Sequence, residues 1–288
     1  MSGNERPSLL RSEGEVDHYQ WLHQHYLNQP NEVSLETLSR CNAACTFCPY
    51  TTLERIGNKM PDQLIDRLID EMSRFEKPFL FSPFKVSEPL LDKRLFPILE
   101  KVNEKVPLAK IRIFSNGAAL TWDNAEKLSW VDNLELFISV NSHIKEEYEP
   151  LMGLSFDRML KHVDQLHGSD FPHAVSVLKV GADPEFAEFC ADRWPHFNCL
   201  LIKKDGWLGY TEADRSEVPD GPCARWFELS IMSTGVVSLC CMDGEGSYPI
   251  GDVNHQTLLE VYNDWRWKER RAELLSRRGI YPCSTCTY

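Results

Sequence analysis

The sequence predicts a mixed α/β fold: a partial (β/α)6 TIM-like barrel followed by a small cysteine-bearing domain. From Val33 onward, short runs of β-branched and aromatic residues alternate with polar turns and helical stretches, a pattern typical of right-handed βαβ units and a parallel sheet. Six such units are present, fewer than the eight of a closed barrel. The pattern changes at the turn-rich stretch SEVPDGPC, beyond which cysteines and aromatic residues become frequent.

These changes divide the chain into three predicted parts. Residues 1–31 are a polar extension expected to lie across the main domain, residues 32–215 form the barrel, and residues 216–288 form the second domain. The expected strands are VSLETL (33–38), PFLFSPF (78–84), KIRIFS (110–115), LELFISV (134–140), AVSVLKV (174–180) and CLLIKK (199–204). The expected helices include 61–75, with Pro61 in its first turn, 156–166, and a segment over 265–283.

Composition excludes several classes of protein. The net charge of -12 and the isoelectric point near 5.3 argue against a nucleic-acid partner, because such proteins usually carry a basic face. The N-terminus has no apolar stretch of signal-peptide length, and no window reaches the roughly 18 apolar residues of a spanning helix. We therefore expect a cytoplasmic protein with no membrane partner. Ten cysteines in a reducing compartment favour metal or redox chemistry over disulfides.

The stretch CNAACTFCPY places Cys41, Cys45 and Cys48 in a C-x3-C-x2-C pattern directly after the first expected strand. A structural zinc site generally closes with four Cys or His ligands, and the nearest downstream histidine, His143, belongs to another unit. Three thiolates on one short loop instead suit a cubane iron–sulfur cluster in which one iron stays open to a small molecule. A zinc site remains the alternative.

With this pattern the chain resembles the radical S-adenosylmethionine (radical SAM) superfamily over nearly its whole length. The resemblance implies that the open iron binds the amino and carboxylate groups of S-adenosylmethionine, and that one electron cleaves the sulfonium to give a 5'-deoxyadenosyl radical. It also places Phe47 next to the adenine. The other cofactor-binding residues that it implies follow successive strands and are Ser87, Glu88, Pro89, Ser115, Asn116, Ser139 and Asn141. Ser87 and its predecessor replace glycines of the family, and each segment alone also suits an ordinary strand-to-helix turn.

The second domain carries Cys223, then Gly235-x4-Cys240, and finally Cys283-x2-Cys286. The apolar runs around Ser-Thr-Gly in LSIMSTGVVSLCC predict a hairpin. This arrangement resembles the twitch domain, a truncated SPASM domain, and the resemblance implies that the four cysteines ligate one auxiliary cluster that transfers electrons. The whole chain is thus expected to hold two [4Fe-4S] clusters, one binding S-adenosylmethionine and one auxiliary. A zinc ribbon built from the same four thiols is the alternative.

Cys241 is left over beside Cys240. On a strand, neighbouring side chains point to opposite faces, so Cys241 is not expected to bind the same iron. It is either a small buried side chain or a thiol that reaches the substrate and donates a hydrogen atom. Cys190 and Cys199 fall within helix and strand patterns of the barrel and are expected in the core.

The small twitch-bearing enzymes that the chain resembles include aminoglycoside epimerases and aminocyclitol dehydrogenases. The resemblance implies a polyol or amino-sugar substrate and a flavodoxin or ferredoxin reductant. We expect epimerisation with Cys241 as the hydrogen-atom donor; oxidation of an alcohol to a ketone, with the auxiliary cluster as electron acceptor, is the first alternative. Lys179, Asp243 and Arg225 are polar groups that could orient or deprotonate a hydroxyl.

Two further classes of function remain open. Many enzymes with this auxiliary domain modify ribosomal peptides, but the 31 residues before the barrel are too few for a leader-peptide-binding winged helix. A zinc-stabilised binding module is the alternative outside enzymology. That alternative predicts zinc in place of iron and no cleavage of S-adenosylmethionine.

Overall fold

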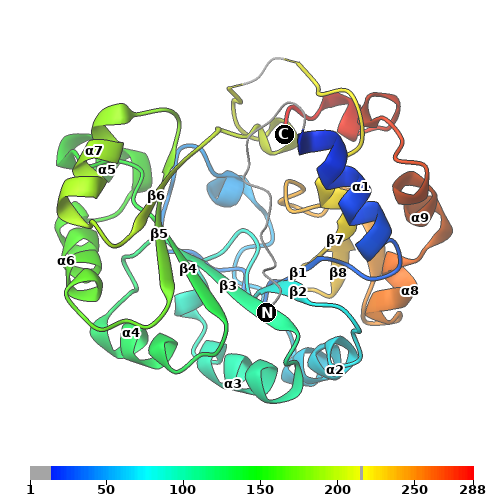
Figure 1. Cartoon of the computed structure of the whole chain (residues 1–288), viewed down its shortest axis with the longest axis horizontal. Coiled ribbons are helices and arrows are strands. Elements are labelled where there is room, and N and C mark those ends of the chain that lie inside the picture. Colours follow the sequence, from blue (N-terminus) through cyan, green and yellow to red (C-terminus); the bar gives the residue numbers. More distant parts are fainter. Residues whose placement is uncertain (1–13, 215–216) are drawn as a thin grey trace.

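The computed structural model describes residues 14–214 and 217–288. Within them, nine strands form one curved sheet in the order β6-β5-β4-β3-β2-β1-β7-β8-β9 (Figure 1). The strands are β1 (Glu32–Leu35), β2 (Phe79–Ser82), β3 (Ala109–Ser115), β4 (Leu134–Ser139), β5 (Ala174–Val180), β6 (Asn198–Ile202), β7 (Glu228–Ile231), β8 (Val236–Ser238) and β9 (Pro249–Asp252). The mixed α/β prediction is confirmed.

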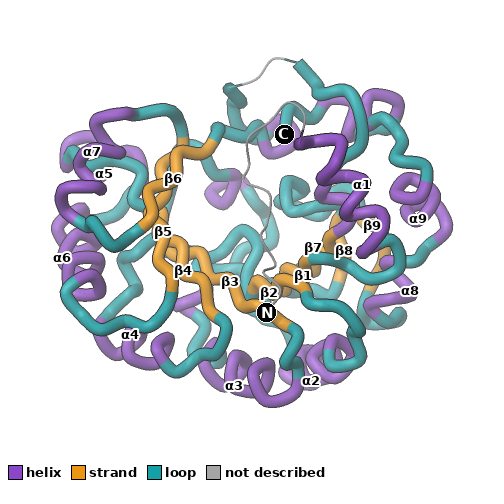
Figure 2. Tube along the Cα trace, in the orientation of Figure 1, coloured by secondary structure: helices purple, strands orange, loops and turns teal. Residues whose placement is uncertain are grey.

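Helices flank the strands on the outer side of the curve (Figure 2). The α-helices are α1 (Gly14–Tyr26), α2 (Asp62–Met72), α3 (Leu95–Lys105), α4 (Trp122–Ser129), α5 (Lys145–Met152), α6 (Phe156–His167), α7 (Pro184–Arg193), α8 (Leu258–Tyr262) and α9 (Trp265–Ala272). The 3-10 helices are η1 (Pro49–Thr52), η2 (Pro89–Leu91), η3 (Trp207–Gly209), η4 (Ala224–Phe227), η5 (Arg277–Gly279) and η6 (Cys283–Thr285). The expected helix over 265–283 ends early, because Leu274 adopts a positive φ of 45° that interrupts the helical path.

Strands β1 to β6 are parallel and neighbour one another in chain order, which is the arrangement of a partial barrel. All six expected barrel strands are present, although their ends differ by a few residues. The helices bury regular apolar stripes against the sheet; on α2, Leu64, Ile65, Leu68, Ile69 and Met72 are all buried. Each such side chain contributes about 1.5–3 kcal/mol when it is fully buried.

The two faces of the sheet differ in chemistry. On β3, Ile111 and Ile113 are fully buried toward the helices, while the alternate residues Lys110 and Arg112 stay partly exposed on the inner face. Strand β4 shows the same alternation, with Glu135 on the inner face. Since parallel sheets are normally buried on both faces, a partly accessible, charged inner face indicates a place for a polar ligand.

The C-terminal segment extends the barrel sheet across the predicted boundary at residues 215 and 216. Strand β7 pairs in parallel with β1, with Val33 opposite Leu229. Strand β8 pairs antiparallel with β7, with Ser230 opposite Ser238, which confirms the predicted hairpin. Because β8 runs antiparallel, its end returns Cys240 to the edge of the sheet at which β1 and β7 begin.

Helix α1 packs mainly on the C-terminal segment and lies beside it in Figure 1. Leu22 and Tyr26 share a buried cluster with Trp226 and Phe227, and the Tyr262 hydroxyl donates to the Tyr26 carbonyl at 2.6 Å. The N-terminal extension, as far as the structure describes it, therefore helps to close the second domain. Residues 1–13 lie outside the described part of the chain.

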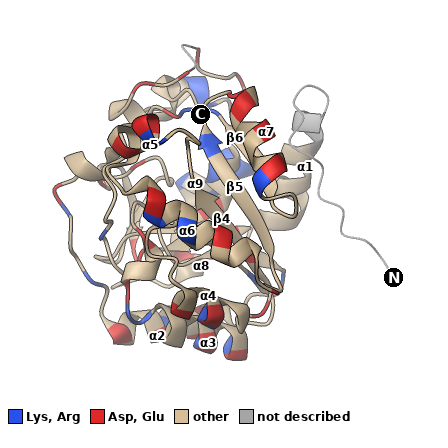
Figure 3. Cartoon of the chain, turned by 90° about the vertical axis from the view of Figure 1, so that its left-hand side faces the viewer, with Lys and Arg blue, Asp and Glu red and all other residues tan. Residues whose placement is uncertain are grey.

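Acidic and basic side chains lie along the outer helices α5, α6 and α7, and acidic ones prevail on α5 and α7 (Figure 3). Several form ion pairs across neighbouring helices or turns, such as Lys145 with Asp157 and Arg193 with Asp164. Exposed pairs of this kind contribute about 0–1 kcal/mol each, so they affect solubility more than stability. Across the described residues, none of the helices has both the length and the apolar character needed to cross a membrane.

Candidate active site

The three-cysteine loop, Cys41–Cys48, leaves the carboxyl end of β1 and is held in place by the end of α5. The Ala44 amide donates to the Met152 carbonyl at 2.9 Å, and the Thr46 amide donates to the Leu151 carbonyl at 3.0 Å. Gly153 ends α5 with φ +65°, and a Cβ there would lie 3.0 Å from the Ala44 Cβ. The loop is thus shaped by backbone contacts that do not depend on its thiols.

The three thiols of this loop face one another closely enough to interact electrostatically. Burial raises the pKa of Cys41 to about 11, and burial together with the Cys48 and Cys41 thiols raises the pKa of Cys45 further. Among the described residues, no three Cys, His, Asp or Glu side chains are close enough to share one metal ion. Each ligand of a cubane binds a different iron, so its thiols lie further apart than those of a zinc site. The loop fits a cluster better than a single ion.

Glu88 lies beside this loop and is almost fully buried, with 2% of its surface exposed. Its carboxylate accepts hydrogen bonds from the backbone amides of Asn116 at 2.8 Å and Leu90 at 3.2 Å, and burial raises its pKa to about 7. Within the described residues, no Lys, Arg or His forms an ion pair with Glu88. The Asn116 side chain donates through Nδ2 to Asn42 Oδ1 at 2.8 Å. A buried carboxylate without a cation partner suits the ammonium of a bound ligand.

The remaining residues expected to contact S-adenosylmethionine differ in exposure and in the hydrogen bonds that their side chains already form. Ser115 accepts a hydrogen bond from Gly117, and Ser139 keeps a partly exposed position on the inner face. The side-chain amide of Asn141 already has partners on both of its polar atoms. Its Oδ1 accepts from the Val180 amide at 2.9 Å, and its Nδ2 contacts the Met152 sulfur. The others are Phe47 and Ser87, both partly exposed, and Pro89, which is buried in η2.

The four C-terminal cysteines come together although they are far apart in sequence. Cys223, Cys240, Cys283 and Cys286 all line one small cavity at the base of the second domain. The first three are buried, and burial raises the pKa of Cys223 to about 12. Four thiols on one cavity are the donor set that a fully ligated cluster requires. The cavity therefore fits the auxiliary centre.

Cys241 does not line that cavity. Burial raises the pKa of Cys241 to about 11 despite the nearby cations. Its charged neighbours are Arg225, Glu228, Lys85 and Glu32. Glu32 and Glu228 stand opposite each other where β1 and β7 begin, and Arg225 Nη1 donates to both carboxylate oxygens of Glu228 at 3.0 Å. Cys240 and Cys241 thus point to different sides, one toward the four-thiol cavity and one toward the barrel.

Charged residues of the inner face form a connected network that the sequence reading did not identify. Arg112 donates to Glu135 at 3.3 Å and lies 3.8 Å from Glu32, and Lys110 also pairs with Glu135. A closed barrel fills these positions with Val, Ile and Leu. The signal was present in KIRIFS and LELF, where charged and apolar residues alternate with a period of two.

All three polar groups proposed from sequence have structural partners, and that of Arg225 is Glu228. The Lys179 ammonium donates to the Asn141 carbonyl at 2.6 Å and pairs with Asp183. The Asp243 carboxylate accepts the backbone amides of Gly246, Ser247 and Tyr248 at 2.9–3.0 Å. Arg225, the third, lies beside Cys241. Cys190 and Cys199 interact with each other at α7 and β6, outside this site.

A partial barrel with a three-thiol loop at one edge and a four-thiol cavity in a small appended domain defines the class of iron–sulfur enzymes. Comparison with known families is more specific: the chain belongs to the radical SAM superfamily, whose family model matches residues 35–187. A second model, of an iron–sulfur cluster-binding domain of the SPASM type, matches residues 223–287. The two matches together imply S-adenosylmethionine and two iron–sulfur clusters as cofactors.

The chain is also similar to individual proteins. It is 24% identical over 245 residues to the S-adenosyl-L-methionine-dependent 2-deoxy-scyllo-inosamine dehydrogenase of Niallia circulans, covering 84% of this chain and 86% of that protein. The crystal structure of BtrN in complex with AdoMet and 2-DOIA matches with a TM-score of 0.65 and 16% identity over 90% of this chain and 93% of BtrN. Streptococcus suis SuiB bound to the precursor peptide SuiA matches with a TM-score of 0.69 and 15% identity, over 100% of this chain and 77% of SuiB. At these identities the structural matches establish the fold alone.

Proposed function

We propose that the protein is a radical SAM epimerase of a small polyhydroxylated, amino-bearing substrate, with Cys241 as the hydrogen-atom donor. The observation that carries this proposal is the position of Cys241. It does not line the four-thiol cavity and instead lies beside Arg225 and Glu228. When bound, S-adenosylmethionine and its cluster supply a carbon radical that removes one hydrogen atom from the substrate. A thiol on the other side of the substrate can then return a hydrogen atom.

The proposed roles of the other residues follow their positions. The thiols of the three-cysteine loop hold the cluster that binds S-adenosylmethionine, and Glu88 receives the cofactor's ammonium group. The four cysteines of the C-terminal cavity hold the auxiliary cluster. The residues proposed to contact the rest of the cofactor are Phe47, Ser87, Pro89, Ser115, Asn116, Ser139 and Asn141, the last with its backbone because its side-chain amide is occupied. We retain the domains 32–215 and 216–288 as functional units.

The inner face is suited to a small substrate that carries hydroxyl and amino groups. The carboxylates of Glu32, Glu135 and Glu228 are balanced there by the cations Lys110, Arg112 and Arg225. Such a surface offers hydrogen-bond donors and acceptors on all sides, as a polyol with an amino group requires. The similarity to a 2-deoxy-scyllo-inosamine dehydrogenase supports an aminocyclitol in particular.

In this reaction the Cys241 thiol supplies a hydrogen atom, and a reductant supplies electrons. The substrate loses one hydrogen atom from one face of a carbon and gains one from the Cys241 thiol on the opposite face. The abstracted hydrogen would leave in 5'-deoxyadenosine, and the cleavage of S-adenosylmethionine to this product and methionine would take one electron from the reductant. Donation leaves a thiyl radical on Cys241, and one electron from a flavodoxin or ferredoxin together with one proton restores the thiol. Arg225 and Glu228 lie beside Cys241 and provide polar contacts for the incoming proton.

Oxidation of a secondary alcohol to a ketone is the second candidate function. The dehydrogenase of Niallia circulans favours it, as does a cavity whose four thiols leave no open position on an auxiliary cluster. In that reaction the substrate radical loses a proton and one electron, and the cluster accepts the electron. The two functions predict different products from the same substrate.

The test is turnover of an aminocyclitol panel by the reconstituted enzyme in D2O, with wild type, Cys241→Ser and the control Cys199→Ser. We expect wild type and the control to give an epimer that carries one deuterium at a carbon, because a thiol exchanges its hydrogen with solvent. Cys241→Ser should consume S-adenosylmethionine without forming the epimer. A ketone from wild type, or an epimer from Cys241→Ser, would reject the role of Cys241 as donor.

A further inference from the structure

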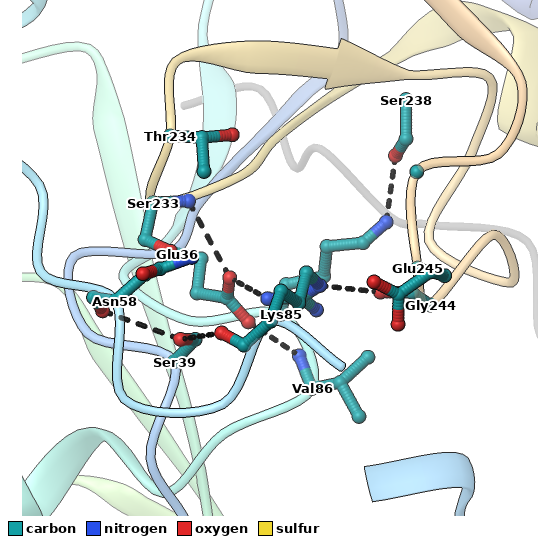
Figure 4. Close-up of polar contacts among 12 residues, drawn as sticks. Glu36, Ser39, Asn58, Lys85, Val86, Ser233, Thr234, Ser238, Gly244 and Glu245 are labelled. Carbon is teal, nitrogen blue, oxygen red and sulfur yellow. Dashed lines mark hydrogen bonds and ion pairs between the residues drawn. The ribbon is translucent and has the colours of Figure 1, made fainter. Parts of the chain in front are cut away.

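Lys85 connects the segment that presents Glu88 with the turn that carries Cys240 and Cys241. It lies three residues before Glu88, only 8% of its surface is exposed, and its side chain runs to the end of β8 (Figure 4). Its ammonium donates to Ser238 Oγ at 2.6 Å, to the Cys240 carbonyl at 3.1 Å and to the Asp243 carbonyl at 2.7 Å.

These three acceptors match the hydrogen-bonding capacity of a charged lysine. An ammonium has three N–H donors, whereas a neutral amine has two. The Ser238 hydroxyl uses its own proton toward the Cys240 carbonyl at 3.0 Å, so it can only accept from Lys85. Burial lowers the pKa of Lys85, whereas the three oxygen acceptors stabilise its charged form.

This cation has no carboxylate partner of its own. In residues 14–214 and 217–288, Lys85 takes part in no ion pair, and the acidic groups that face it are Cys240, Cys241, Asp243 and Glu36. The Glu36 carboxylate pairs with Arg55. It also accepts from the backbone amides of Val86 and Ser233 (Figure 4). The Asp243 carboxylate is occupied by the three amides of residues 246–248.

A buried unpaired cation costs several kcal/mol, so a compensating anion is expected close by. The Cys240 carbonyl that Lys85 binds belongs to a residue whose thiol lines the four-thiol cavity. A [4Fe-4S] cluster held by four thiolates carries a net negative charge in both its oxidised and its reduced state. That cavity is therefore the place where the missing anion fits.

We propose that Lys85 is a buried counter-cation of the auxiliary cluster, in addition to Arg225 and Arg277 that line the cavity, and that it raises the reduction potential of that cluster while it fixes the turn around Cys240 and Cys241. This inference rests on the proposed ligand set of the cavity. A positive charge stabilises the reduced cluster more than the oxidised one, because the reduced form is the more negative, and net charge and hydrogen bonding are known to set such potentials.

The segment that carries Lys85 and Glu88 also contacts the chain next to the three-cysteine loop. The Glu88 amide donates to the Arg40 carbonyl at 2.8 Å, directly before the three-cysteine loop. Arg55, a few residues beyond the same loop, donates through Nε to the Gly244 carbonyl at 2.7 Å. Lys85 and Arg55 thus join the cofactor-binding segments to the Cys240–Gly244 turn, and of these two only Lys85 binds the backbone of a proposed cluster ligand. Arg225 and Arg277 line the cavity itself.

The test isolates the auxiliary cluster in a Cys41→Ala/Cys45→Ala/Cys48→Ala parent and measures its midpoint potential by EPR-monitored redox titration. Iron is counted in the same samples. The variants of that parent are Lys85→Met, Lys85→Gln and Lys85→Arg, and Lys127→Met on the exposed face of α4 is the matched control for loss of one positive charge. Lys85→Gln keeps hydrogen-bond donors without the charge, and Lys85→Arg keeps the charge.

We expect Lys85→Met and Lys85→Gln to lower the ratio of reduced to oxidised cluster at least tenfold at a fixed potential, a shift of about 59 mV for one electron. Lys85→Arg and Lys127→Met should stay near the parent value. Loss of iron from the Met and Gln variants, but not from Lys85→Arg, would also support the need for charge.

Three results would overturn the proposal. The first is an unchanged midpoint potential in iron-loaded Lys85→Gln or Lys85→Met. The second is loss of the cluster from all three Lys85 variants, since Lys85→Arg retains the charge. The third is a parent that holds no iron, which would reject the auxiliary cluster itself and thereby separate failure of the proposed ligand set from failure of the Lys85 role.

Discussion

Replacing Glu88 with Gln tests the proposed cofactor site most directly. The substitution keeps the size of the side chain and an oxygen that can accept from the Asn116 amide, so the local hydrogen bond at 2.8 Å is retained. It removes only the negative charge. Glu126→Gln, on the outer helix α4, is the control for a neutral substitution elsewhere.

The size of the effect follows from the burial of Glu88. Burial raises its pKa from 4.5 to about 7, which corresponds to about 3 kcal/mol of unfavourable free energy for the ionised carboxylate in the free protein. A ligand ammonium offsets that cost. Since a hydrogen bond to a charged group contributes about 1.5–3 kcal/mol, Glu88→Gln should raise the Kd for S-adenosylmethionine about 10- to 150-fold.

The assay is anaerobic equilibrium binding of S-adenosylmethionine to reconstituted protein between pH 6 and pH 8.5. Wild-type affinity should weaken as the pH falls through about 7, because Glu88 then takes up a proton. The affinity of Glu88→Gln should show no such step. A Kd within threefold of wild type at pH 8.5, or an identical pH profile, would refute this account of Glu88.

The raised pKa of Glu88 also predicts a change in stability. A carboxyl with a raised folded-state pKa stabilises the fold fully below its unfolded value of 4.5, and this contribution is lost as the pH rises through about 7. Glu88→Gln should therefore melt at a higher temperature than wild type at pH 8.5 without S-adenosylmethionine, and the difference should shrink at pH 6. A lower melting temperature at pH 8.5 would contradict this.

Three other substitutions test how the site is supported. Gly153→Ala would place a Cβ 3.0 Å from the Ala44 Cβ at a φ of +65°, so we expect the three-cysteine loop to lose its irons while the auxiliary irons stay, as counted per chain. Equal iron in both proteins would contradict this. Arg55→Met leaves the Glu36 carboxylate buried and unpaired, and should lower the free energy of unfolding by about 3–5 kcal/mol in denaturant titrations; a change below about 1 kcal/mol would count against the pair. Asp243→Asn weakens three bonds to backbone amides and should cost about 2 kcal/mol or more, measured by the same titration, and an unchanged midpoint would show that the turn does not need the charge.

The sequence by itself determined the features that depend on short-range pattern. The spacing of Cys41, Cys45 and Cys48 indicated three ligands on one loop, and that loop indeed follows β1. Alternation of strands and helices predicted the parallel order of β1 to β6, because a crossover helix constrains its neighbouring strands. The expectation that Cys240 and Cys241 lie on a strand was wrong, because β8 ends at Ser238 and both cysteines lie in the turn that follows. Of the two, Cys240 lines the four-thiol cavity.

Only the tertiary structure decided which distant residues meet. Cys223, Cys240 and Cys283 reach one cavity because β8 reverses direction after β7 and the last segment returns beneath it, a closure that no local periodicity encodes. The same pairing of β7 with β1 extends the barrel sheet beyond the predicted boundary at residues 215 and 216.

The charged inner face and the Lys85 contacts were hidden for the same reason. Arg112 and Glu135 read as ordinary polar positions of alternating strands until the sheet curves and turns them toward Glu32. Lys85 reads as one more surface lysine until the fold buries it against the Cys240 carbonyl. Burial and charge compensation depend on every element packed around a group, so they are properties of the assembled fold and cannot be derived from neighbours along the chain.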